Sequence, residues 1–130
     1  MAFNDPIAEL LTKVRNAGGA QHRYVDLSHS WIKVQILEIL KSHGFIENFL
    51  VNEEQHKIRV FLRYTKNRES VIHGLKRVSK NGLRRYIGYS DIPRVFNGMG
   101  LAVLTTPKGV MDGETARNLK VGGEFLCTVW

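Results

Sequence analysis

The sequence contains one cysteine, three prolines and no long apolar run. The single Cys127 excludes an internal disulfide framework and a zinc site made of several cysteines. No stretch approaches the roughly 18 apolar residues that a membrane span needs, so we expect no membrane partner. The start of the chain, Met1 to Pro6, has neither the basic nor the apolar region of a secretory signal.

Catalytic and cofactor motifs are also lacking. The five histidines are scattered without the spacing of metal ligands, and the carboxylates do not cluster as a two-metal nuclease requires. No glycine-rich phosphate loop is present. Cys127 lies in an apolar stretch, which predicts a packing role. We therefore expect no enzyme, no cofactor and no metal; a small histidine-dependent nuclease is the alternative from another class.

Negative charge is scarce in the second half of the chain. The 130 residues include 19 Lys and Arg against 12 Asp and Glu, a net charge of +7. Residues 1–65 have a net charge of +1, whereas residues 66–130 have +6. The densest stretch, Lys57 to Arg85, holds ten basic residues and one acid. Such a run can be only a solvated surface, but solubilising surfaces usually mix both signs, so the asymmetry favours a phosphate-binding face.

Helix and strand periodicities alternate in the first half. Asp5 and Pro6 suit a helix start, and apolar residues at helical spacing follow them. A second apolar stripe, Ile32 to Leu40, predicts another helix. The expected elements are a helix at 5–17, a strand at 23–27, a helix at 30–42 and strands at 45–51 and 57–65. The pattern predicts an N-terminal α/β lobe over residues 1–66.

Short strands and turns dominate the rest of the chain, after a polar linker at 65–70. The expected elements are strands at 71–79, 83–87, 101–106 and 124–130, a helical turn at 90–96 and a helix at 112–119. This pattern predicts a mostly antiparallel β lobe with one short helix over residues 71–130. The fold class that we predict is α+β, with two small lobes.

Two loops of the second lobe have residue types that suit RNA recognition. Thr105 and Thr106 end an apolar strand and precede Lys108 and a flexible Gly109, which offers hydroxyls beside a cation. An ordinary strand exit is the alternative for this loop.

The second loop, Gly122-Gly123-Glu124, allows close approach of another backbone beside a hydrogen-bond acceptor. A simple turn with a solvated acid is the alternative here. Tyr86, next to Arg84, can stack on unpaired bases, although a tyrosine in a strand is more often a core residue.

Seven segments resemble the family of small-subunit ribosomal protein eight. They are residues 5–16 (DPIAELLTKVRN), 44–47 (GFIE), 76–86 (KRVSKNGLRRY), 92–95 (IPRV), 98–102 (GMGLA), 105–111 (TTPKGVM) and 122–127 (GGEFLC). The segments are spread over nearly the whole chain in the family's order, which is far more specific than any one motif.

The resemblance implies a structural protein that binds the central domain of small-subunit rRNA directly and aids its assembly. It also implies contacts with neighbouring small-subunit proteins, and a position in the cytoplasmic ribosome or, alternatively, in a plastid or mitochondrial one. Repression of its own operon through an mRNA hairpin is the alternative function. The implied RNA-binding residues are Thr105, Thr106, Lys108, Gly109, Gly122, Gly123, Glu124, Tyr86, Arg84 and Lys33.

Pro107 departs from the family pattern, which usually has serine there. Proline lacks both the hydroxyl and the backbone N–H, so we expect that contact to be lost or replaced. The neighbouring Thr106 hydroxyl should then contribute more. On this basis Thr106→Val should weaken RNA binding by about 1–2 kcal/mol and leave folding nearly unaffected.

Overall fold

The first helix in the computed structural model, which describes residues 5–130, begins at the predicted cap. The Asp5 carboxylate accepts hydrogen bonds from the backbone N–H groups of Ile7 and Ala8, at 3.1 and 3.2 Å, and Pro6 occupies the first helical position. Helix α1 (Pro6–Gly19) therefore starts with two of its free N–H groups satisfied. The first four residues, used above against a secretory signal, lie outside the described residues.

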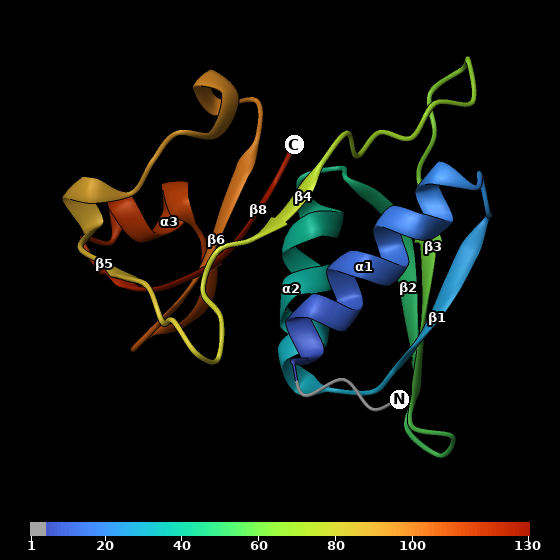
Figure 1. Ribbon diagram of the computed structural model, residues 1–130, viewed down its shortest axis with the longest axis horizontal. Helices are drawn as coiled ribbons and strands as arrows, with labels where there is room; N and C mark the ends of the chain where they lie inside the picture. The colour runs from blue at the N-terminus through green and yellow to red at the C-terminus, as the bar shows by residue number, and fades with distance from the viewer. Residues whose placement is uncertain (1–4) are drawn as a thin grey trace. The chain divides into compact units, whose positions relative to one another are not determined.

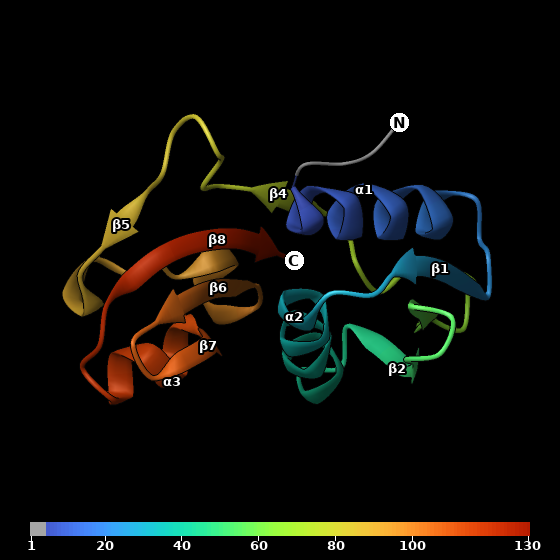
Figure 2. The ribbon, with the colours of Figure 1, turned by 90° about the horizontal axis from the view of Figure 1, so that it is seen from below.

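The first sheet is antiparallel, with the strand order β1-β3-β2. Its strands are β1 (Tyr24–Ser28), β2 (Ile46–Asn52) and β3 (Lys57–Leu62). Helices α1 and α2 (Trp31–Ser42) pack on one face of this sheet (Figure 1, Figure 2). In β3, Ile58, Val60 and Leu62 are buried while Lys57 and Arg59 are exposed, which is the alternation of a strand with one face in the core.

The second sheet is built around its last strand, β8 (Gly123–Val129). Strand β8 pairs antiparallel with β4 (Leu75–Arg77), β5 (Tyr86–Ile87) and β6 (Leu101–Thr106), and β6 pairs with β7 (Gly109–Asp112). Helix α3 (Gly113–Asn118) and two short 3₁₀ turns complete this part. Cys127 is fully buried, as predicted. One buried cluster consists of Ile92, Ala102, Leu104, Met111, Ala116 and Phe125.

The described chain divides into two compact units between His73 and Gly74, each with its own sheet. The predicted α+β class is therefore confirmed. None of the described helices combines the length and the hydrophobicity that a membrane-spanning helix needs.

Several strands differ from their predicted bounds. Strand β4 has only three residues, because Val71 instead donates its N–H to the Arg63 carbonyl, at 3.1 Å. Strand β3 ends at Leu62, and beyond it Tyr64 forms an isolated bridge with Ser70. Strand β7 was not predicted, since four residues are too few to show an alternating pattern.

Candidate nucleic-acid interface

A shallow hollow in the second unit brings the two predicted loops together. Glu124 lies opposite Tyr86 in β5 on one side and opposite Thr105 in β6 on the other. We call this the β8 surface. It is lined by Tyr86, Ile87, Gly88, Thr105, Thr106, Pro107, Gly122, Gly123 and Glu124. Sheet register thus joins segments that are far apart in the sequence.

The glycine pair keeps these strands close together. A Cβ atom on Gly123 would lie 2.1 Å from the Thr105 carbonyl oxygen, and one on Gly122 would lie 2.4 Å from the Ile87 carbonyl oxygen. Neither contact is tolerable for a real side chain. The glycines therefore allow close approach of another backbone, as predicted, and that backbone is the chain's own, at Thr105 and Ile87.

Glu124 is held by neighbouring side chains at the edge of the hollow. Its Oε2 accepts hydrogen bonds from the Ser79 hydroxyl at 2.5 Å and from the Arg84 guanidinium at 2.9 Å. Burial by itself would raise the pKa of Glu124. The hydrogen bonds from Ser79 and Arg84 and the charges of Arg84 and Arg77 outweigh burial, so the pKa lies below its ordinary value. The carboxylate is therefore ionised at neutral pH and fixed in position.

The same contacts order the segment that leads into β5. Ser79 is fully buried, and its hydroxyl also accepts a hydrogen bond from the Arg85 N–H at 3.2 Å. Arg84 reaches the Asn81 side-chain oxygen at 3.1 Å, and Lys80 and Leu83 exchange backbone hydrogen bonds across the turn, each at 3.0 Å. Ser79 and Asn81 were not predicted as site residues. Ser79 lies 45 positions before Glu124, and no local pattern reveals a contact over that separation.

Thr106 closes the β6–β7 hairpin. Its hydroxyl donates to the Gly109 carbonyl at 2.9 Å and accepts from the Lys108 N–H at 3.1 Å, and the residue is only 9% exposed. Both hydrogen-bonding roles of this hydroxyl are filled within the turn, so we now expect its removal to affect folding, contrary to the expectation from the sequence. Thr105, one position earlier, is half-buried and borders the hollow.

The backbone conformation of this turn accommodates Pro107. Thr106 pairs with Gly109, so Pro107 and Lys108 are the two turn residues between the strands. The first turn position favours the φ that proline imposes. Gly109 has a φ of +119°, which side chains disfavour.

Tyr86 and three cations of the second unit are exposed. Tyr86 is 71% exposed, although its strand pairs with β8. Within residues 5–130, no ion pair or hydrogen bond engages the side chains of Lys80, Arg85 or Lys108, all of which are exposed. An exposed ring and unpaired cations in one unit are the residue types that stack on bases and contact phosphates.

Lys33 does not fit the predicted role. It lies in α2 of the first unit and is 1% exposed. Its ammonium pairs with the Glu9 carboxylate and donates to the Ser28 carbonyl at 2.8 Å and hydroxyl at 2.7 Å. An ammonium enclosed in this way cannot reach RNA without leaving three partners, so we remove Lys33 from the candidate interface.

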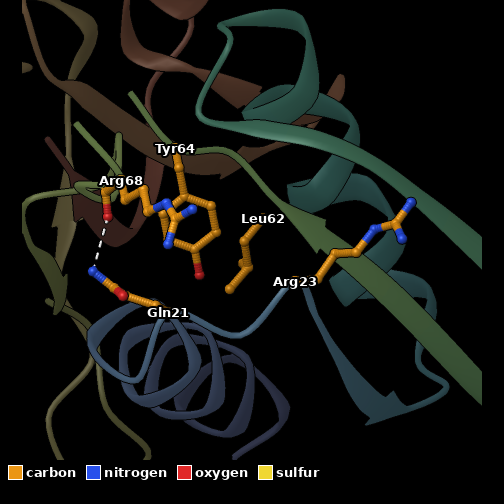
Figure 3. Close-up of a pocket in the computed structure, with 5 residues that line it drawn as sticks. All are labelled: Gln21, Arg23, Leu62, Tyr64 and Arg68. Atoms are coloured by element: carbon orange, nitrogen blue, oxygen red, sulfur yellow. Dashed lines mark hydrogen bonds between the residues drawn. The ribbon is translucent and has the colours of Figure 1, made fainter. Parts of the chain in front are cut away.

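A second hollow, in the first unit, is lined by Gln21, Arg23, Leu62, Tyr64 and Arg68 (Figure 3). The Tyr64 hydroxyl donates to the His22 carbonyl, and Gln21 donates to the Arg68 carbonyl at 3.1 Å. Figure 3 shows that the Arg23 side chain points away from the hollow. These contacts tie the end of α1 to the chain after β3, so we interpret the hollow as structural. Within the described residues, no three His, Cys, Asp or Glu side chains could together hold a metal ion.

These features describe a small, basic α+β protein with an open sheet surface. The family model described as Ribosomal protein S8 matches residues 5–130. The Small ribosomal subunit protein uS8 of Protochlamydia amoebophila is 50% identical over 133 residues and 100% of both chains. That of Chlamydia trachomatis serovar D is 55% identical over 129 residues, 98% of this chain and 97% of the relative. That of Anaeromyxobacter sp. (strain K) is 51% identical over 132 residues and 100% of both chains. The chain belongs to the ribosomal protein S8 family.

Proposed function

We propose that the chain is a structural, non-catalytic component of the small ribosomal subunit. We further propose that it binds the central domain of the rRNA directly and aids its assembly. Family membership supports the first part, as do full-length relatives that are named as small-subunit proteins. Those relatives come from bacteria, which favours a bacterial cytoplasmic ribosome over an organellar one.

The RNA-binding part of the proposal rests on one observation, the convergence of β5, β6 and β8 on the β8 surface. Residues 74–130 have nine basic and four acidic side chains, so this unit also has most of the excess positive charge. The predicted division of labour, with residues 71–130 as the rRNA-binding lobe and residues 1–66 as the supporting lobe, stays part of this proposal.

The proposed mechanism is shape recognition on a preformed surface. Lys80, Arg85 and Lys108 supply salt-dependent phosphate contacts, and the exposed Tyr86 ring stacks on an unpaired base. Glu124 acts mainly by fixing Arg84 and Ser79, since its carboxylate already accepts hydrogen bonds from both. Double-stranded RNA offers few readable base edges, so an irregular, partly unstacked site suits this surface.

Footprinting of small-subunit rRNA with and without the protein tests the proposal. We expect protection at an irregular helical site of the central domain. Tyr86→Ala should weaken binding to that fragment by about 1–3 kcal/mol, the typical loss of one base–aromatic stack. Trp31→Ala, which removes a 64% exposed ring from the first unit, is the matched control and should bind as wild type.

Equal effects of the two aromatic variants, measured by filter binding while both are folded, would reject the β8 surface as the binding site. Competition by a hairpin of the protein's own operon mRNA would show that a repressor function uses the same surface.

A further inference from the structure

The basic character of the chain is interrupted in the first unit. Residues 42–56, which include β2 and the turn to β3, contain three glutamates and neither lysine nor arginine. A hollow of about 790 Å³ lies against this segment. It is lined by Asp26, Leu50, Val51, Asn52, Glu53, Glu54, Gln55, Lys57 and Arg59. We call this the Leu50 surface.

The Leu50 surface lies on the open face of the first sheet. Asp26, Arg59 and Leu50 lie side by side across β1, β3 and β2, and all three are exposed. The adjacent row contains Leu27 and Ile58, which are buried beneath the helices. Because successive residues of a strand point to opposite faces, the first row faces away from α1 and α2.

The positive charge nearest the centre of this surface is already neutralised. The Arg59 guanidinium donates two hydrogen bonds to the Asp26 carboxylate, at 2.8 and 3.1 Å, and lies 4.0 Å from the centre of the Tyr24 ring. Hydrogen bonding and charge from Arg59 outweigh burial and lower the pKa of Asp26, so the pair stays charged at neutral pH.

Two carboxylates then dominate the remaining charge. Within the described part of the chain, no ion pair engages Glu53, Glu54 or Lys57. The two glutamates therefore leave a net negative charge beside the Asp26–Arg59 pair. A phosphate backbone would be repelled here, whereas a cationic side chain would be attracted.

An apolar side chain is exposed at the same place. Leu50, on an edge strand of the sheet, is 57% exposed, whereas Val51 pairs with Ile58 and lies in the row that faces the helices. Exposed apolar residues on a sheet edge are usually shielded or used for binding. An apolar centre with acidic neighbours matches a partner segment that has an apolar anchor between basic residues.

We propose that the Leu50 surface docks a lysine- and arginine-rich segment of another protein. An apolar side chain of that segment packs on Leu50, and its cations pair with Glu53 and Glu54. The inference rests on the proposed function only in placing the partner in the same small subunit. RNA and a second copy of this chain, which would present its own basic lobe, are the competing occupants.

Titration of the purified protein with a synthetic peptide tests the chemistry without the ribosome. The probe is an eight-residue peptide with two central leucines and three Lys or Arg on each side. We expect backbone amide NMR shifts centred on residues 50–55. Glu53→Gln/Glu54→Gln should weaken binding roughly fivefold, the scale of losing exposed ion pairs. The matched control, Glu38→Gln, changes an exposed glutamate on α2 and should have no effect.

Peptide shifts that avoid residues 50–55, or an affinity unchanged in the double variant, would overturn the proposal. So would oligouridine binding to the same amides. Self-association of the wild type that Leu50→Asp abolishes would identify a second copy as the occupant instead.

Photocrosslinking identifies the occupant in the assembled particle. The variant has p-benzoylphenylalanine at position 50, and a control variant has it at the exposed position 35 on α2. In purified small subunits we expect position 50 to cross-link to a protein segment rich in Lys and Arg, and position 35 not to label that segment. A cross-link to rRNA, or to a segment without basic residues, contradicts the proposal. Absence of the chain from small subunits would reject the proposed function, and the peptide titration would still decide the docking chemistry.

Discussion

Both units contain a glutamate held by a serine hydroxyl and a cation, but in different surroundings. In the first unit, Glu9 is bound by Ser28 and Lys33, and the Lys33 side chain is 2% exposed. In the second unit, Glu124 is bound by Ser79 and Arg84, and the Arg84 side chain is 45% exposed. The comparison shows that one set of residue types can serve the core or the surface, depending on the burial of the cation.

Burial determines what each cluster can do. Lys33 joins α2 to α1 through Glu9 and to the end of β1 through Ser28, so its charge stabilises the fold of the first unit. The Arg84 side chain is 45% exposed although it pairs with Glu124, so it is the cation that the proposed RNA-binding function would use. The difference yields predictions that separate effects on stability from effects on RNA binding.

The largest effect that we expect is from Lys33→Met. Removing the cation leaves the Glu9 carboxylate buried without its charge partner, which should lower the free energy of unfolding by about 3–5 kcal/mol. Urea unfolding followed by circular dichroism measures this loss. Glu9→Gln/Lys33→Met should recover part of it, because no buried charge then remains. If Lys33→Met stays as stable as wild type but binds RNA less tightly, the distinction between the two clusters fails.

Thr106→Val should lower the free energy of unfolding by about 1–2 kcal/mol. This effect on stability takes the place of the weaker RNA binding that the sequence predicted for the same variant. Valine keeps the shape but leaves the Lys108 N–H and the Gly109 carbonyl without the Thr106 hydroxyl. Thr105→Val is the control and should unfold as wild type does. Thermal unfolding measures both variants, and equal stability would mean that the hydroxyl is replaceable by water.

Stability should fall in acid through both clusters. Burial raises the pKa of Glu9, but hydrogen bonds from Lys33 and Ser28 and the nearby positive charge lower it overall, as for Glu124. As the pH falls, these two carboxylates therefore take up protons near the ordinary pKa of 4.5 in the unfolded chain, and only at lower pH in the folded chain. The stability that the two ionised carboxylates contribute is complete above this ordinary pKa. It is lost as the pH falls through their lowered pKa values in the folded chain. Unfolding curves between pH 7 and pH 3 should show a shallower decline for Glu9→Gln, and a parallel decline would contradict this.

The smallest effect on stability should come from Lys108→Gln, within about 0.5 kcal/mol, because the side chain is exposed. RNA affinity should nevertheless fall, and the slope of log K against log salt should decrease by about 0.7–0.9, the value for one phosphate contact. Filter binding at several salt concentrations measures the slope. Lys41→Gln, in the first unit, is the control, and a slope shared by both variants and wild type would remove Lys108 from the interface.

Local patterns in the sequence predicted the parts of the fold that depend on near neighbours. The Asp5 cap, the alternation in β3 and the bounds of β6 all follow from residues close in sequence. The resemblance placed Tyr86 and the two loops in one binding region, and the sheet register supplies a physical basis for that grouping. The grouping as an RNA site stays a prediction.

Hydrogen bonds between residues far apart in the sequence could not be predicted from local patterns. The Ser79–Glu124 contact depends on how the second unit folds, and Ser79 alone has no distinguishing pattern. The apolar stripe from Ile32 to Leu40 predicted helix α2, but the buried face of this helix also includes Lys33. Lys33 has the helical spacing of Ile36, Leu37 and Leu40, which are all buried, so a signal for its burial was present. Treating every lysine as exposed hid that signal.

Pro107 also affects the entropy of binding. A turn with a free φ at its first position samples many conformations and must lose that freedom when a ligand orders it. Proline removes most of this freedom beforehand, and the Thr106 hydroxyl closes the other side of the turn. The tip of the β6–β7 hairpin is therefore preorganised, and in the proposed RNA complex a smaller ordering cost on association would offset the loss of one hydroxyl.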